Sequence, residues 1–205
     1  MSLALLHVDE HIVAVDKPAG LLSVPGRGEQ DCAAARVAAL VADALIVHRL
    51  DMATSGLLLF ARGAAVQRRL SIAFAQREVD KRYVAVVHGR LESACGSIEL
   101  PLIADWPQRP RQKVDAAHGK PSVTHYRVLT HDAAGNTSRL ELQPVTGRAH
   151  QLRVHLMALG HPIVGDTLYG RADDAAPRLL LHACSLQLVH PGSGSPLRLR
   201  SDPPF

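Results

Sequence analysis

One stretch of the chain is more informative than any other: His48-Arg49-Leu50-Asp51-Met52-Ala53-Thr54-Ser55-Gly56-Leu57-Leu58. The guanidinium of Arg49 and the carboxylate of Asp51 stand two residues apart, ahead of a Ser-Gly turn and an apolar run. Residues 57–61 do not alternate between apolar and polar, which predicts a strand buried on both faces. A short acidic loop that leads into such a strand would hold Asp51 firmly at the floor of a cleft.

Asp51 has two interpretations. It could be an ordinary aspartate in a turn before a strand, or it could be a catalytic carboxylate. The second interpretation gains weight because Asp51 stands between apolar segments, where a charge is costly unless it is paired. Burial raises the pKa of a carboxyl group, whereas a guanidinium within ~4–6 Å lowers it by roughly 1–3 units. A buried reactive Asp51 therefore requires an arginine partner.

Three arginines are candidates for that partner: Arg49, Arg148 and Arg153. Arg49 is nearly adjacent in the loop, so we expect its side chain to point toward a ligand. Arg148 and Arg153 belong to a second dense cluster, Thr146-Gly147-Arg148-Ala149-His150-Gln151-Leu152-Arg153-Val154-His155. Arg153 falls on a predicted helix, which suits a fixed charge partner. The alternative for Arg153 is a surface position on an amphipathic helix.

Length and composition favour one globular domain. The chain has 205 residues, of which 47% are hydrophobic and 20% are charged, so it can build a core. No apolar stretch approaches the ~20 residues that span a bilayer. The start lacks a basic region and soon turns acidic, which argues against a signal peptide. The odd number of widely spaced cysteines (Cys32, Cys95 and Cys184) indicates reduced thiols and a cytoplasmic location.

The charge balance favours a polyanionic partner, because the net charge is +4. Aromatic residues make up only 3% of the chain, which argues against a sheet that stacks several bases. Two basic segments carry an aromatic ring. Tyr83 follows Lys81 and Arg82 at a predicted strand start, where it could be ordinary packing or could stack on a base. Residues 105–113 hold Trp106 with three cations, which is typical of a solvated loop and equally of an arm that grips RNA.

The chain reads as strands with interspersed helices. Residues 3–8 and 11–15 predict a hairpin, and Gly135-Asn136 predicts a turn between two later strands. Gly160 should end the last helix. Asp31 is a candidate cap for the first helix. Predicted helices cover 32–44, 64–77 and 151–159, and further predicted strands cover 83–87, 97–100, 123–129, 138–142, 179–181 and 186–189. Without strict alternation, this pattern favours an α+β fold with a mixed, largely antiparallel sheet.

Metal and nucleotide motifs are absent from the sequence. His150 and His155 are five positions apart, not the four that place two ligands on one helical face. The zinc-deaminase and H-E-x-x-H patterns are missing, as are the P-loop, the Rossmann glycines and the G-x-S-x-G elbow. We therefore expect no metal.

At this point the residues resemble a known family, the RluA-type pseudouridine synthases. The segment from His48 to Gly56 is similar to the family signature. Further segments follow the family order and cover essentially the whole chain: Asp16-Lys17-Pro18-x-Gly20-Leu21, Lys81-x-Tyr83-x-Ala85, the Thr146–His155 cluster, Leu159-Gly160-His161-Pro162-Ile163-x-Gly165-Asp166 and Leu179-Leu180-Leu181-His182-Ala183. The 105–114 loop and the Gly119-Lys120-Pro121 turn resemble the branch with dual specificity for 23S ribosomal RNA and tRNA.

The resemblance implies an enzyme that isomerises specific uridines in structured RNA without a cofactor. It implies a pseudouridine synthase catalytic fold as a single domain over residues 1–205, with no room for an S4 domain, and a monomer. Asp51 would be the catalytic carboxylate, Arg153 its charge partner and Tyr83 a ring on the flipped base. Arg49 would fill the vacated space. The remaining predicted substrate-binding residues are Leu152, Leu181, Arg109, Arg111, Lys113, Arg148 and His150.

Two rival functions remain open. The chain could be an RNA-binding assembly factor without catalysis, although a pure binder needs no buried carboxylate. It could also be a hydrolase that cleaves the glycosidic bond with two carboxylates. That second acid would have to be Glu78, Asp80 or Asp166.

Overall fold

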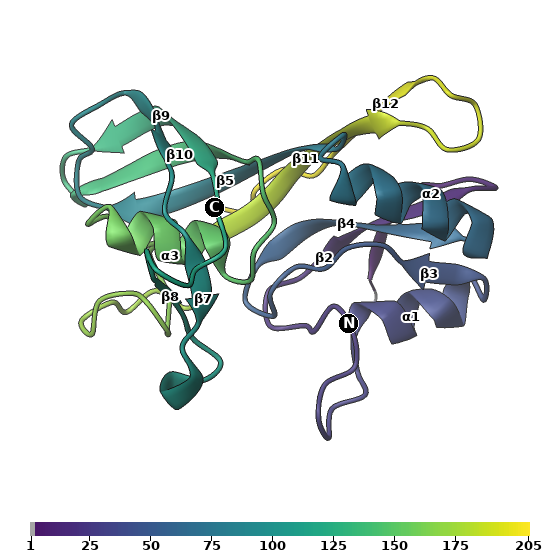
Figure 1. Cartoon of the computed structure of the whole chain (residues 1–205), viewed down its shortest axis with the longest axis horizontal. Coiled ribbons are helices and arrows are strands. Elements are labelled where there is room, and N and C mark those ends of the chain that lie inside the picture. Colours follow the sequence, from purple (N-terminus) through teal and green to yellow (C-terminus); the bar gives the residue numbers. More distant parts are fainter. Residues whose placement is uncertain (1–2) are drawn as a thin grey trace. The chain divides into compact units, whose positions relative to one another are not determined.

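The computed structural model describes residues 3–205 (Figure 1). Met1 and Ser2, at which the predicted domain begins, lie outside the described residues. The chain forms two compact units. The first unit runs up to Lys81 and includes His182–Phe205, and the second is Arg82–Leu181. The prediction of a single catalytic domain over 1–205 stays a prediction.

The first unit is built on a strand with no exposed face. In β4 (Ser55–Arg62), every residue from Ser55 to Ala61 is buried, which confirms the strand predicted at 57–61. The strands follow the order β1-β2-β4-β11. All pairs are antiparallel except β4 with β11, and β3 and β12 join β4 and β11. Their bounds are Ala4–Val8 (β1), Ile12–Lys17 (β2), Ala44–Ile46 (β3), Leu181–Val189 (β11) and Pro196–Arg200 (β12).

Two helices complete the first unit: α1 (Ala33–Leu40) and α2 (Ala64–Ala75). Asp31 does not cap α1, so that prediction is wrong. The cap is Cys32, whose Sγ accepts the Ala35 N–H, while the Asp31 carboxylate pairs with Arg36 instead. The helix also stops at Leu40, four residues before the predicted end, because the chain turns there to form β3.

The second unit contains a four-stranded antiparallel sheet and one helix. The strand order is β5-β10-β9-β6, and the predicted Gly135-Asn136 turn joins β9 to β10. The predicted strand at 179–181 is wrong for residues 179 and 180, because β11 begins only at Leu181. The bounds are Asp80–His88 (β5), Cys95–Ile98 (β6), Thr124–Asp132 (β9), Thr137–Pro144 (β10) and Gln151–Ala158 (α3).

A separate two-stranded hairpin also belongs to the second unit. It consists of β7 (Leu102–Ala104) and β8 (Gln112–Val114), with the 3-10 turn η1 (Trp106–Gln108) at its far end (Figure 1). Sequence patterns missed both strands, because three residues are too few for a period to emerge. The predicted α+β class with a mixed, largely antiparallel sheet is confirmed.

Candidate active site

In the first unit, the loop that carries Asp51 is clamped on both sides of that residue. The Ser23 hydroxyl donates to the Leu50 carbonyl (2.7 Å) and accepts the Leu50 N–H (3.0 Å). The Met52 carbonyl accepts the Gly20 N–H (2.8 Å) and a hydrogen bond from Lys17 Nζ (3.1 Å). Asp51 itself is half-buried. The backbone at Asp51 is therefore held in place by residues some thirty positions upstream.

Lys17 is the centre of this clamp. Its side chain is fully buried, and Nζ donates to the carbonyls of Pro18, Leu21 and Met52 at 2.7–3.1 Å. A buried ammonium is tolerated only where its donors are matched by acceptors. This arrangement gives a physical reason for the Asp16–Leu21 motif, which supports the Asp51 loop.

We expect Lys17→Met to destabilise the protein by about 2–4 kcal/mol, because three buried carbonyls lose a charged donor. Turnover should fall as well, since the Asp51 loop loses its support. Urea unfolding with a parallel activity assay measures both effects. Lys120→Met is the matched control for stability, because Lys120 is exposed and should change it by less than about 0.5 kcal/mol. Equal unfolding midpoints for the two variants would contradict this account.

His48 fixes the other end of the same segment. Its Nε2 accepts the Leu59 N–H (3.0 Å) from β4, and its ring stacks on Phe74 of α2 at 4.6 Å between centroids. Burial, with a smaller contribution from the charge of Lys81, lowers the pKa of His48 to about 3. The ring is therefore neutral at physiological pH and acts as a fixed acceptor rather than an acid or base.

The Ser55-Gly56 pair connects the His48–Gly56 segment to the Leu181-His182-Ala183 segment of β11. These two residues pair in parallel with His182 and Ala183 of β11, and Ser55 Oγ lies 2.8 Å from His182 Nδ1. Gly56 has a φ of 111°, and a Cβ there would collide with the Ala183 carbonyl. Only glycine tolerates both this positive φ and the close approach of the Ala183 carbonyl.

In the second unit, Arg153 is a buried ion-pair residue. Its side chain is 4% exposed, so the alternative of a surface arginine is wrong. Nε and Nη2 donate to the two oxygens of Asp166 at 2.8 and 2.7 Å, a bidentate pair. Sequence reasoning weighed Asp166 only as a hydrolase acid and missed this pairing.

The environment of Asp166 also tests whether this residue could be the second acid of a glycosidic-bond hydrolase. Burial alone would raise its pKa, but the hydrogen bond and charge of Arg153, with the N–H groups of Leu168 and Tyr169, hold that pKa below its usual value. Asp166 is therefore ionised at neutral pH. A general acid must be protonated, so Asp166 does not suit that role.

A buried polar network sets the start of α3. The side-chain oxygen of Gln151 accepts from the Thr146 hydroxyl and the Arg148 N–H. Its side-chain nitrogen donates to the Val123 carbonyl and the Thr124 hydroxyl. His155 Nδ1 lies 3.0 Å from the same Thr124 hydroxyl. These contacts fix the helix on which Leu152 and Arg153 lie, and they account for several residues of the Thr146–His155 cluster.

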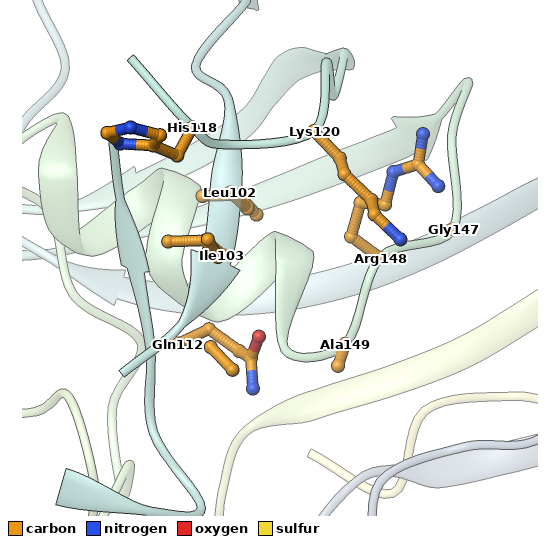
Figure 2. A pocket seen from close by; sticks show the side chains of 9 residues that line it. Leu102, Ile103, Gln112, His118, Lys120, Gly147, Arg148 and Ala149 are labelled. Atoms are coloured by element: carbon orange, nitrogen blue, oxygen red, sulfur yellow. The ribbon is translucent and has the colours of Figure 1, made fainter. Parts of the chain in front are cut away.

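A cavity of about 410 Å³ opens beside the start of α3 (Figure 2). Leu102, Ile103 and Ala149 give it an apolar surface. Lys120 and Arg148 stand at one side, and among residues 3–205 neither forms an ion pair. Arg148 also donates to the Pro121 carbonyl at 3.3 Å. The cavity therefore combines an apolar surface with two cationic side chains. Sequence reasoning singled out Arg148 but not Lys120 as a binding residue.

The β7–β8 hairpin carries the basic segment 105–113. The Trp106 side chain is exposed, and the Arg109 guanidinium lies over its ring, 3.1 Å from the centroid. Lys113 is also exposed. The segment thus presents an exposed ring and cations at the surface of the second unit, and the predicted RNA-gripping arm stays a prediction.

The predicted site residues fall in both units. Asp51 and Arg49 belong to the first, in which the Arg49 side chain is exposed. Tyr83 lies on β5, half-buried, opposite Leu142 of β10. The other predicted residues belong to the second unit with it: Arg153, Leu152, Leu181, Arg109, Arg111, Lys113, Arg148 and His150. The pairing of Asp51 with Arg153 stays a prediction.

One cluster in the described part of the chain has metal-ligand residue types: Asp9, His11 and His190. His190 Nδ1 accepts the N–H groups of Gly192 and Ser193, so the hydrogen of its ring is on Nε2. That Nε2–H donates to Asp9 Oδ2 at 3.0 Å. Hydrogen bonds thus account for the Asp9–His190 contact, and His190 in this orientation offers no lone pair toward Asp9.

The comparisons with known proteins agree with this geometry. Residues 11–158 match the family described as RNA pseudouridylate synthase. The solved structure of human RNA pseudouridylate synthase domain containing 1 is 28% identical, with a TM-score of 0.83 over 100% of this chain and 84% of that one. The fold and the sequence together define the class: the chain is an RNA pseudouridine synthase, an isomerase that acts on uridines in RNA.

Within that class the chain belongs to the RluA family. It is 49% identical over 207 residues to the dual-specificity RNA pseudouridine synthase RluA of Escherichia coli (strain K12), covering 99% of this chain and 94% of the relative. It is 50% identical to the corresponding protein of Salmonella typhi, over 97% of this chain and 92% of the relative. Neither an assembly factor without catalysis nor a hydrolase is favoured. Among residues 3–205, no helix combines the length and apolarity needed to cross a membrane.

Proposed function

We propose that the protein converts specific uridines of structured RNA, in 23S ribosomal RNA, in tRNA anticodon stem-loops or in both, to pseudouridine. The relatives that are about half identical to it carry the name of dual-specificity enzymes. The basic β7–β8 hairpin and the cavity with Lys120 and Arg148 support a substrate of linked phosphates and bases. A monomer that works in the cytoplasm, where these RNAs are found, is part of the proposal.

The catalytic carboxylate in this proposal is Asp51. The reaction breaks the N1–C1′ bond and forms a C5–C1′ bond; C5 loses its proton and N1 gains one, so the atoms balance without a cofactor. A reactive carboxylate must stay at one position relative to C1′ and the base. The observation that carries this role is the double clamp on the backbone of Leu50 and Met52.

Arg153 and Tyr83 complete the proposed catalytic group. Arg153, on a helix fixed by the Gln151 network, would keep Asp51 ionised through its positive charge. Tyr83 would stack on the flipped base, with Leu152 and Leu181 as apolar walls. Extruding the target costs a few kcal/mol, and the exposed Arg49 would occupy the space that the base leaves.

Release of tritium from RNA labelled at C5 of uridine tests the proposal. The expected result is release with no free uracil, because the base is rejoined to its own ribose. Free uracil would indicate a hydrolase, and tight RNA binding without release would indicate an assembly factor. Mapping of pseudouridine in total RNA, with and without the protein, identifies the modified positions.

We expect Lys113→Gln to weaken RNA binding and to reduce the slope of log K against log salt by about 1, as for the loss of one phosphate contact. Fluorescence anisotropy with a labelled stem-loop at several salt concentrations measures both quantities. Arg127→Gln is the matched control, because Arg127 is an exposed cation of the same unit whose guanidinium pairs with Glu141. An unchanged slope for Lys113→Gln would remove this residue from the RNA-binding surface.

A further inference from the structure

Tyr169 contacts both the β7–β8 hairpin and the start of α3, to which the proposed function gives separate roles. Its hydroxyl accepts the Gln112 N–H from β8 at 2.7 Å and lies 2.7 Å from Nδ1 of His150, the residue before α3. The residue is 5% exposed. The phenol therefore connects the loop end of the β7–β8 ladder to the start of the helix that carries Arg153.

The ring and backbone of Tyr169 also reach Arg153. The Arg153 guanidinium carbon lies 5.1 Å from the ring centroid. The Tyr169 N–H donates to Asp166 Oδ1, the same oxygen that accepts Arg153 Nη2. On the hairpin side, the Arg111 guanidinium carbon is 5.4 Å from the ring centroid. The Tyr169 ring thus lies close to one arginine that precedes β8 and to one arginine of α3.

Apolar packing makes the connection rigid. Leu102 of β7, Val154 of α3 and Tyr169 form one buried cluster, with Val114 of β8 and Met157 against it. Because β7 and β8 have only three residues each, their own ladder gives the hairpin little support. The direction of the hairpin then depends on its contacts with the rest of the unit. Tyr169 supplies contacts at both ends of the ladder: its ring belongs to the cluster with Leu102 and Val114 at the base, and its hydroxyl accepts from Gln112 at the loop end.

We propose that Tyr169 is a positioning residue that couples RNA contact at the β7–β8 hairpin to the orientation of Arg153. The inference rests on the proposed function, since it assumes that the hairpin grips RNA and that Arg153 serves the catalytic group. Burial raises the pKa of Tyr169, so the hydroxyl keeps its proton at neutral pH. It can accept from Gln112 and donate to His150 Nδ1 at the same time.

Tyr169→Phe removes only the hydroxyl and keeps the ring on Arg153. We expect kcat/KM for a stem-loop RNA to fall about tenfold, because the hydrogen bonds of the hydroxyl with Gln112 and His150 are both lost. Hydrogen exchange at the Gln112 amide should speed up. Tyr126→Phe is the matched control, because Tyr126 is half-buried on β9 in the same unit and donates no hydrogen bond within residues 3–205.

A double-mutant cycle with Arg109→Ala separates coupling from loss of structure. If the hydroxyl transmits hairpin contact to Arg153, the double variant should lose clearly less than the product of the two single losses. Thermal unfolding of each variant checks that the folded fraction is unchanged. In the corresponding cycle of Tyr126→Phe with Arg109→Ala, the loss in kcat/KM of the double variant should equal the product of the two single losses.

The coupling would be overturned if the losses in kcat/KM of Tyr169→Phe and Arg109→Ala simply multiplied in the double variant. It would also be overturned if Tyr169→Phe changed neither kcat/KM nor hydrogen exchange at the Gln112 amide. A variant that loses activity only in proportion to its unfolded fraction would overturn it as well. The unmodified protein separates this failure from failure of the proposed function. If it releases no tritium from the RNA, the proposed function itself is wrong.

Discussion

Asp51→Asn should abolish pseudouridine formation, with a fall in kcat of more than about a thousandfold, which corresponds to about 4 kcal/mol of transition-state stabilisation. The amide has nearly the shape of the carboxylate but lacks its charge and its nucleophilic or basic oxygen. The loop should stay in place, because its clamps act on the Leu50 carbonyl and N–H and on the Met52 carbonyl rather than on the Asp51 side chain. RNA affinity should therefore persist.

Tritium release under single-turnover conditions, with anisotropy for binding, measures the two effects separately. Asp43→Asn is the matched control: it removes an aspartate of the same unit that forms an exposed ion pair with Arg62, and its rate should stay within about twofold, as such pairs contribute little. Measurable turnover by Asp51→Asn close to that of Asp43→Asn would rule Asp51 out as the catalytic carboxylate.

Arg153→Met is expected to have two large effects. Catalysis should drop at least a hundredfold, because the proposed partner of Asp51 loses its charge. The protein should also lose about 3–5 kcal/mol of stability, because Asp166 would be left as an unpaired buried carboxylate. Activity loss alone would thus not distinguish a catalytic role from a structural one.

The double variant Arg153→Met, Asp166→Asn makes that distinction. Removing both charges should recover much of the stability, because no unpaired charge stays buried and the amide oxygen at position 166 still accepts the N–H groups of Leu168 and Tyr169. Turnover should stay low. A double variant that regains near-native turnover would exclude Arg153 from the catalytic group, and its role would be the Asp166 pair alone.

The pH dependence of stability gives an independent check on the pair. The folded pKa of Asp166 lies below its unfolded value. The stabilisation from its ionised form is therefore complete above the unfolded pKa and is lost as the pH falls through the folded pKa. In urea unfolding, the unmodified protein should therefore lose stability relative to the double variant as the solution becomes acidic, and an unchanged difference between the two would contradict this account.

Local patterns were sufficient for the elements with strong periodicity or clear turn residues. The unbroken apolar run of β4 predicted a strand without an exposed face, and Gly135-Asn136 predicted the β9–β10 turn. The leucines of 151–159 and Gly160 predicted α3 and its end, where Gly160 has a φ of 89°. In each case the signal lies within one segment and its physical cause is the local backbone or the burial of one face.

Other features depended on which of several polar or charged groups pair with one another. Cys32 rather than Asp31 caps α1, because Asp31 pairs with Arg36. The partner of Arg153 within its unit is Asp166, thirteen residues away, and the support of the Asp51 loop is Lys17. No period or spacing indicates which of several charged groups will be brought together.

Sequence alone was enough for the family, the α+β class and the identity of the reactive candidates, because motif residues and apolar periods are encoded segment by segment. Tertiary structure decided which groups hold those candidates in place. A buried charge such as Lys17 or Arg153 needs acceptors at specific positions in space, and only the packing of distant segments supplies them. The Tyr169 connection is of the same kind, since its hydroxyl meets a strand and a helix start that lie 57 and 19 residues earlier in the chain.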